Sequence, residues 1–359
     1  MKYSDNPAPS KLNRLTDFVA NMSPSLFAIV MATGIVSMAA SLHGMQAIGM
    51  ALTVVNFVSF IVLWLLTLWR LVAFPKNVLA DVSDVRSAFG FFTWIAAGNV
   101  LGVQAVRILK LPDLAFGIWC FSVGLWVLLT YAVFYFVMAH ANKPDWREAL
   151  GGGWLLAVVA TQSCAVLGSQ VAHGSPLISL ATAFWFGTGA LLYIVIISAI
   201  FFRLTLFELA PKQLVPPYWI NMGAISITTL AGTRIINDAP HFPGNMGALL
   251  PFFGGITFIF WAFATWWIPL LILLGLWKHA ITRLPLSFTP ALWSMVFPLG
   301  MYATCTKMME AAFHVKVFGL ISGVFAYVAI AVCALVAMGL LKTAIREVRN
   351  LRSAPNPTA

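Results

Sequence analysis

The chain has 359 residues, of which 61% are hydrophobic and only 9% charged, and its formal net charge is +10. An ordinary soluble domain is about 25% charged, so this composition excludes a soluble globular protein and predicts one integral membrane domain. The positive charge then points to membrane topology rather than to nucleic acid, and no nucleic-acid partner is expected.

Apolar runs long enough to cross a bilayer, about 20 residues each, recur along the chain. Several of them begin with a proline, such as Pro24, Pro112 and Pro176, which a helix tolerates in its first turn because the N–H there has no partner. The sequence therefore predicts an all-α protein with ten transmembrane helices. The predicted spans are approximately 24–42, 48–69, 87–106, 112–138, 154–170, 177–202, 218–234, 246–275, 290–311 and 317–341.

The distribution of positive residues predicts the orientation. Most of the 21 lysines and arginines fall on one side of the membrane, which the positive-inside rule makes the cytoplasm. We expect a cytoplasmic tail at residues 1–23, a transport domain at 24–345 and a second cytoplasmic tail at 346–359. The protein is expected in the plasma membrane, as a multi-pass protein of a bacterial inner membrane with the lipid bilayer around it.

Polar residues concentrate in the odd-numbered spans. Polar groups in a membrane face the bundle interior or a cavity, so the odd helices are predicted to lie inside and the even helices outside. This pattern gives five helical hairpins around a central lumen, each with one inner and one outer member.

The ninth span contains the most unusual stretch, Trp293 to Glu310. Pro298 removes a backbone donor and Gly300 a side chain in mid-span, and polar residues follow them. In hydrocarbon, freed backbone groups and charges need partners in protein or in water-lined space. We interpret this stretch as the wall of a transport pathway.

Three cations, Arg107, Arg234 and Lys307, fall at the outer ends of odd spans. If these helices line a lumen, the cations surround its outer mouth and attract anions. The alternatives are anchors that extend to the membrane surface, a pair between Lys307 and Glu310 on one helix, and neutralisation of Arg234 by the nearby Asp238.

Hydroxyl and amide side chains within the odd spans are candidates for lining the pore. The same groups can instead form hydrogen bonds between helices, which is the commoner role for any single one. The candidates are Thr33, Ser37, Thr93, Asn99, Thr161, Ser163, Thr229 and Thr304.

Catalytic and metal-binding patterns are missing from the sequence. The four cysteines form no C-x-x-C pair, the six histidines form no helical pair, and neither H-E-x-x-H nor G-x-S-x-G occurs. We therefore expect no enzyme activity, no cofactor and no metal site.

Several segments resemble the tellurite-resistance/dicarboxylate transporter family, which includes plant slow anion channels, fungal malate permeases and sulfite exporters. They are S-P-S-L-F-A-I-V-M-A-T-G-I-V-S from Ser23, F-F-T-W from Phe91, F-A-T-W-W from Phe263 and W-S-M-V-F-P-L-G from Trp293. One departure is Ala32, where many members have glycine.

The resemblance implies quasi-fivefold symmetry, a homotrimer with one pore per subunit, and a small anion as the substrate. It also implies a pore-plugging phenylalanine in the ninth helix, which here is Phe297 before Pro298, so that Phe297, Pro298 and Gly300 form the gate. The predicted function is transport of a dicarboxylate such as malate, or of an inorganic monoanion. The alternatives are a proton-coupled or weak-acid C4-dicarboxylate or sulfite carrier, and an exporter linked to tellurite resistance.

Overall fold

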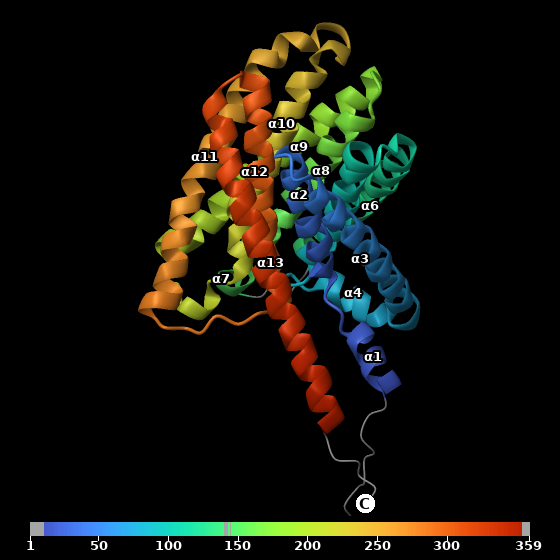
Figure 1. Ribbon diagram of the computed structural model, residues 1–359, viewed down its shortest axis with the longest axis vertical. Coiled ribbons are helices and arrows are strands. Elements are labelled where there is room, and N and C mark those ends of the chain that lie inside the picture. Colours follow the sequence, from blue (N-terminus) through green and yellow to red (C-terminus); the bar gives the residue numbers. More distant parts are fainter. Residues whose placement is uncertain (1–10, 140–142, 144, 354–359) are drawn as a thin grey trace, which may run out of the picture.

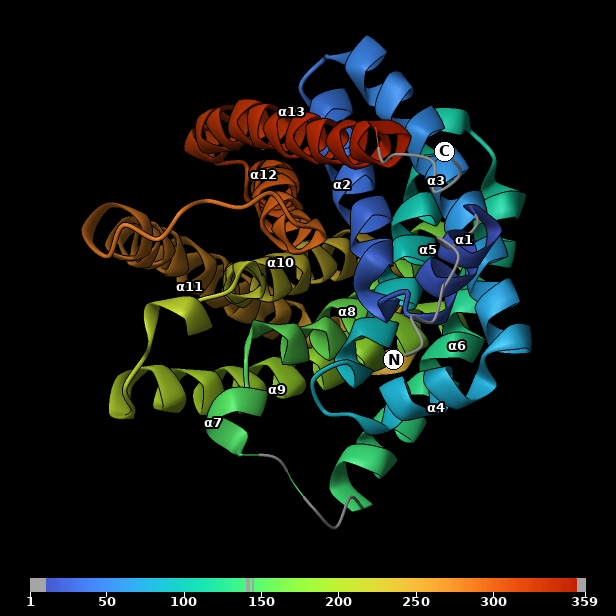
Figure 2. The ribbon, with the colours of Figure 1, turned by 90° about the horizontal axis from the view of Figure 1, so that it is seen from below.

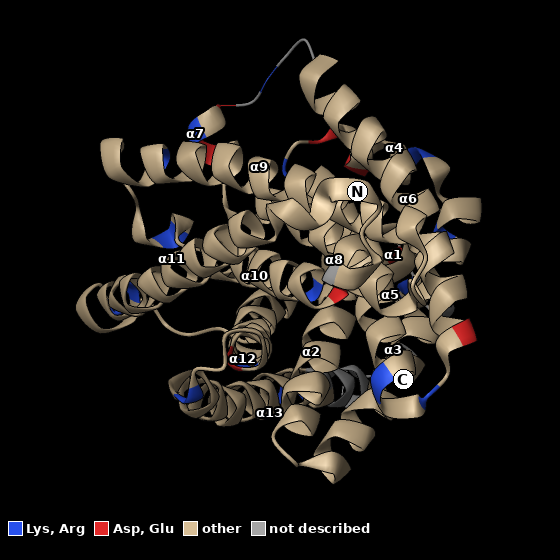
Figure 3. Ribbon diagram, turned by 90° about the horizontal axis from the view of Figure 1, so that it is seen from above, with Lys and Arg blue, Asp and Glu red and all other residues tan. Residues whose placement is uncertain are grey.

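The computed structural model describes residues 11–139, 143 and 145–353, and every regular element in these ranges is a helix. Eight of the described helices are long and apolar enough to cross a membrane (Figure 1). Acidic and basic residues occupy short segments, mainly at helix ends and in loops (Figure 3). These features confirm the prediction of an all-helical protein with the character of a multi-pass membrane protein.

Ten long helices alternate between buried and exposed along the chain. Of the eight candidate spans, three have 72–89% of an apolar 18-residue stretch buried inside the molecule, whereas the other five have only 22–39% of such a stretch buried. The inner helices are α2 (Ala28–Leu42), α5 (Phe92–Gln104), α8 (Leu156–Val171), α10 (Ile220–Asp238) and α12 (Trp293–Phe313). The outer helices are α3 (Gln46–Ala73), α6 (Pro112–Ala139), α9 (Pro176–Leu206), α11 (Leu250–Leu276) and α13 (Lys316–Ser353).

The inner helices pack against one another in chain order. Helix α2 contacts α5, α5 contacts α8, α8 contacts α10, α10 contacts α12, and α12 returns to α2. Each inner helix also packs against the outer helix that follows it, and Figure 2 shows the outer helices on the periphery of the inner set. The apolar outer helices thus separate the more polar inner helices from the surroundings.

A repeat too weak to see in the sequence is visible in the structure. The inner helices α2, α5, α8 and α10 begin at residues 28, 92, 156 and 220, a constant step of 64 residues. A short 3-10 turn directly precedes every inner helix. The fifth, α12, begins later, at residue 293, after an extended connection that follows α11.

Two of the predicted spans differ from the other eight. Residues 218–234 and 290–311 are helical, in α10 and α12 and the 3-10 turns directly before them, but neither is apolar enough to stand among the eight candidate spans. Their polar residues are the cause, because α10 alone buries Asn221, Thr228 and Thr233.

Parts of both predicted tails are helical. Helix α13 continues to Ser353, past the predicted tail boundary at 346, and α1 (Lys11–Ala20) lies within the predicted tail 1–23. Arg70 holds the end of α1, because its Nη2 donates to the Ala20 carbonyl at 3.2 Å and to Asp81 Oδ2 at 2.7 Å. Residues 1–10 and 354–359 of these tails lie outside the described residues.

Candidate functional site

A wide cavity opens where the five inner helices begin. It contains about 1410 Å³ of atom-free space, and the centres of water-sized spheres can occupy about 570 Å³ of it. We call it the vestibule. Its lining includes Ser23, Ser25 and Ala28 before and in α2, Gly90 and Thr93 at α5, Gly152 and Leu156 at α8, Pro217 and Ile220 at α10, and Pro290 and Ser294 at α12.

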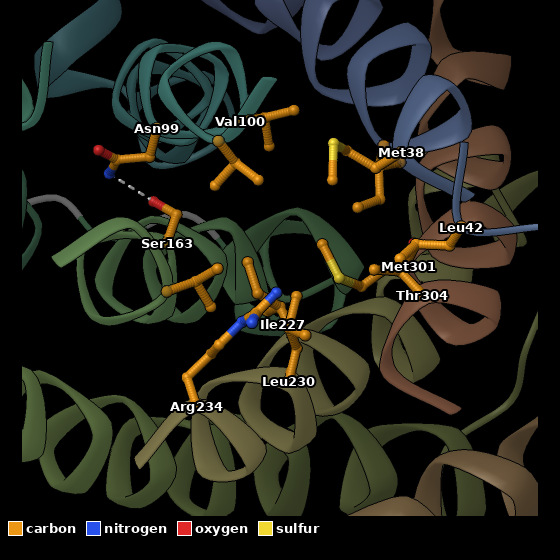
Figure 4. A pocket seen from close by; sticks show the side chains of 13 residues that line it. Met38, Leu42, Asn99, Val100, Ser163, Ile227, Leu230, Arg234, Met301 and Thr304 are labelled. Atoms are coloured by element: carbon orange, nitrogen blue, oxygen red, sulfur yellow. Dashed lines mark hydrogen bonds between the residues drawn. The ribbon is translucent and has the colours of Figure 1, made fainter. Parts of the chain in front are cut away.

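A second, narrower cavity lies farther along the same helices, and we call it the central cavity. It contains about 450 Å³ of atom-free space, but the centres of water-sized spheres are confined to about 30 Å³. All five inner helices line it (Figure 4). The lining residues are Ile35, Met38, Leu42, Asn99, Val100, Val103, Ser163, Val166, Ile227, Leu230, Arg234, Met301 and Thr304.

On every inner helix, the same spacing separates a residue that lines the vestibule from a residue that lines the central cavity. A residue that lines the vestibule is followed seven positions later by one that lines the central cavity, as in Ala28 and Ile35, or Ser294 and Met301. Seven residues make about two helical turns, or about 10 Å, and keep the same helix face. One continuous strip on each inner helix therefore runs from one cavity to the other.

The layer between the cavities combines small and large side chains, of which Phe297 is the bulkiest. Three residues after the vestibule positions lie Met31 of α2, Ala96 of α5, Val159 of α8, Gly223 of α10 and Phe297 of α12. Phe297 lies three residues after Ser294 and four before Met301, so helical spacing puts it on the strip that both share. Its side chain is buried, with 2% exposed.

Pro298 and Gly300 make close helix packing possible beside this layer. A Cβ added to Gly223 would lie 2.7 Å from Pro298 Cγ, and one added to Gly300 would lie 3.0 Å from Ile35 Cγ2. The two glycines therefore bring α10 against α12 and α12 against α2. Pro298 is inside a continuous helix.

Arg234 is the only charged residue in the described lining of the central cavity, and Figure 4 shows its side chain extending from α10 into that space. Its Nε is enclosed and has no hydrogen-bond partner within the described part of the chain. Asp238 does not neutralise it, because Asp238 accepts a hydrogen bond from Ser179 at 2.6 Å and contacts His241 at 3.0 Å. That alternative prediction was wrong.

The other two predicted mouth cations already have partners. Arg107 Nε donates to Gln170 Oε1 at 2.7 Å. Lys307 Nζ contacts Glu310 Oε2 at 2.5 Å, with both side chains about one-third exposed, which confirms the predicted pairing on one helix. Arg234 is thus the member of the predicted set that reaches the central cavity without a partner among the described residues.

A family model described as a voltage-dependent anion channel matches residues 21–341 of the chain. The chain belongs to this family. The match covers every helix of both cavities, so the site described above lies entirely within the family's domain.

Curated relatives of this member of the voltage-dependent anion channel family include transporters. An uncharacterised transporter of Methanocaldococcus jannaschii is 26% identical over 85% of this chain and 88% of its own length. A sulfite efflux pump of Arthroderma otae is 25% identical over 95% and 96%. An uncharacterised membrane protein of Mycobacterium tuberculosis is 39% identical over 42% of this chain and 75% of its own length.

Four of the eight polar candidates of this family member line a cavity. Thr93 lines the vestibule, and Asn99, Ser163 and Thr304 line the central cavity. Asn99 Nδ2 donates to Ser163 Oγ at 2.8 Å, which holds these two side chains together (Figure 4).

The other four candidates form hydrogen bonds to helices. Thr33 contacts Asn56 of α3 at 2.6 Å, and Ser37 contacts Thr53 of α3 at 2.8 Å. Thr161 accepts from Trp126 of α6 at 2.9 Å, and Thr229 donates to a carbonyl of its own helix. Thr33 and Ser37 thus fix α3 to its inner partner α2, and Thr161 fixes α8 to the outer helix of the preceding hairpin, α6.

The sequence interpretation missed the vestibule and most of the apolar lining of the central cavity. Met38, Leu42 and Met301 carry no sequence signal that separates a cavity wall from an ordinary core. The short 3-10 turns that shape the vestibule coincide with Pro24, Pro216 and Pro290 in three of the five helices. Among the described residues, no group of three or more side chains could hold a metal ion.

Proposed function

We propose that this protein transports small anions across a membrane along a pathway formed by the vestibule, the Phe297 layer and the central cavity. The observation that carries the proposal is the shared strip on all five inner helices, which leads from the vestibule to a cavity containing Arg234. Membership of a family of anion channels supports it.

The proposed architecture consists of ten transmembrane helices, arranged as five hairpins with quasi-fivefold symmetry around the pathway. The closed order of contacts among the inner helices and the repeat of 64 residues support this arrangement. In it, α10 and α12 also cross the bilayer, because polar residues are tolerated where helices face a lumen. We propose further that the protein is a homotrimer in the plasma membrane, with both termini in the cytoplasm.

The vestibule attracts anions without a ring of free cations. All five inner helices begin there, and the N-terminal end of a helix carries a partial positive charge. Arg86 at its edge forms an ion pair with Glu148 at 2.8 Å and is largely exposed. The helix ends thus supply a positive potential on the cytoplasmic side, and the mouth residues Arg107 and Arg234 supply it on the other.

Phe297 is the proposed gate, with Pro298 and Gly300 fixing its helix. Replacing Phe297 with alanine removes the bulkiest side chain from the layer between the cavities. We expect Phe297→Ala to raise chloride flux at least about tenfold in proteoliposomes, because an aromatic ring in a narrow pore excludes ions and water.

The matched control for this experiment is Phe258→Ala, since Phe258 lies on the outer helix α11 and is 47% exposed. It should leave the flux unchanged. Equal flux in Phe297→Ala and the unmodified protein would remove Phe297 from the gate. Absence of anion flux in every variant, with monodisperse protein, would overturn the transport function itself.

A carrier for weak acids is the second candidate, because sulfite efflux pumps are related over nearly the full length of the chain. The substrates in this alternative are sulfite, C4-dicarboxylates or compounds linked to tellurite resistance. An imposed pH gradient that drives net uptake of sulfite or malate against its own gradient would favour the carrier. Passive flux that follows only the anion gradient and the membrane potential would favour the channel.

A further inference from the structure

We propose that the central cavity holds a single anion-binding site at Arg234, and that the site selects small monoanions over dianions such as C4 dicarboxylates. This inference rests on the proposed transport function and specifies its substrate class. It depends on three features of the cavity, namely an unpaired cation, a lack of further charge and a small volume.

An unpaired guanidinium inside a cavity is a costly arrangement. Removing a charge from water is unfavourable, and the cost is recovered only when a counter-charge and hydrogen bonds replace the water. Arg234 Nε has no partner among the residues described, and the nearest acid on its helix, Asp238, is occupied by Ser179 and His241. A small anion in the cavity would complete the interactions of Arg234.

The polar neighbours of Arg234 suit an anion of one charge. The described lining contains one cation and no acid, and its other polar residues are Asn99, Ser163 and Thr304. The charge of Arg107 acts on Arg234, but Arg107 donates to Gln170 and does not line the cavity. A dianion would therefore contact a single cation within walls formed largely by Met38, Met301 and aliphatic side chains.

The shape of the cavity favours a small ligand independently of charge. The centres of water-sized spheres can occupy about 30 Å³, and one water needs about 10–15 Å³ on this measure. The cavity therefore holds a group the size of two or three waters, which fits chloride, nitrate or hydrogensulfite. A C4 dicarboxylate is larger than this space.

Competition in proteoliposomes tests the inference. Uptake of radiolabelled chloride is measured while unlabelled chloride, nitrate, malate or sulfate is added at equal ionic strength. We expect nitrate to compete at concentrations at least about tenfold lower than malate or sulfate, because the second charge of a dianion stays unpaired in the cavity. Equal competition by malate or sulfate would overturn the inference, although flux itself would still support transport.

Sulfite provides a second test with one compound in two charge states. Near neutral pH it exchanges between hydrogensulfite and the sulfite dianion, so lowering the pH raises the share of the monoanion. We expect sulfite flux, divided by chloride flux at the same pH, to rise as the pH falls. A ratio that stays constant or declines would contradict selection for the monoanion.

Variants of Arg234 test whether this residue, rather than the pathway as a whole, causes the preference for monoanions. We expect Arg234→Gln to lower chloride flux at least about tenfold and to abolish the preference over malate, whereas Arg234→Lys retains the preference. The control Lys316→Gln removes an exposed cation of the same predicted side, at the start of the outer helix α13, and it should retain the order of competition. If Arg234→Gln does not yield monodisperse protein, the unmodified protein still decides the question through the competition and sulfite experiments.

Discussion

His43 connects three helices at the end of α2. Its Nε2 lies 2.8 Å from Ser322 Oγ of α13, and Ser322 donates its own proton to the Ala303 carbonyl of α12 at 2.6 Å. Because the hydroxyl proton is already used, His43 must donate from Nε2. Lys307 and Glu310 of α12 also act on the ring, and burial followed by the charge of Lys307 lowers the pKa of His43, against a smaller opposite effect of Glu310.

This lowered pKa predicts a loss of stability in acid. The unfolded chain, with a histidine pKa of about 6.5, binds the proton more readily than the folded protein. The contribution to stability is therefore full above that pKa and is lost as the pH falls through the folded one. Between about pH 7.5 and about pH 5.5, we expect the melting temperature of the purified protein to fall more than that of His43→Gln, whose amide can still donate to Ser322. Parallel declines would show that His43 is not responsible.

Single residues also show where prediction from sequence succeeds and where it stops. The polar pattern indicates which helices lie inside, and Asn99, Ser163 and Thr304 line the central cavity. Thr33 and Thr161 belong to the same helices but bond to the outer helices. The rotation of each helix decides between these roles, and that rotation depends on packing against neighbours distant in the sequence.

At the scale of elements, the contact between α10 and α12 fixes the width of the layer around Phe297. Gly223 allows the approach, because an added Cβ would lie 2.7 Å from Pro298 Cγ and 3.2 Å from its Cα. The proline ring cannot move away as a flexible side chain would. The sequence shows both residues, but only the structure shows that they meet.

Gly223→Ala should therefore push α10 and α12 apart. We expect a loss of about 1–3 kcal/mol of folding stability, as for other overpacked sites, measured as a lower melting temperature in detergent. Gly124→Ala is the control, because Gly124 of the outer helix α6 has no atom within 4 Å of an added Cβ and should be neutral or slightly stabilising. Equal melting temperatures for the two variants would contradict this account of the interface.

At the scale of the whole molecule, hydropathy and the polar pattern were sufficient to predict the order of the helices and their alternation. They did not predict that α13 continues to Ser353 or that α1 is held by Arg70. Both features depend on contacts or helix continuation outside the apolar spans, where hydropathy carries no information.

The predicted orientation in the membrane depends only on the distribution of lysines and arginines, and thiol labelling tests it. In a Cys120→Ala background, which removes an exposed native cysteine, Asp113→Cys and Lys143→Cys place thiols at exposed positions at opposite ends of α6. We expect an impermeant thiol reagent to label Asp113→Cys in intact cells and Lys143→Cys only after lysis. The reverse labelling pattern would show that the protein has the opposite orientation, with the vestibule open to the outside of the cell.

The vestibule has an electrical consequence in the proposed pathway. Because it is wide enough to hold many waters, it carries the potential of the adjoining solution into the bundle as far as the Phe297 layer. The transmembrane voltage then falls over the shorter, closed remainder of the path instead of over the full thickness of the hydrocarbon. An anion beside Arg234 would therefore experience a concentrated electric field, so its movement there would respond steeply to membrane voltage.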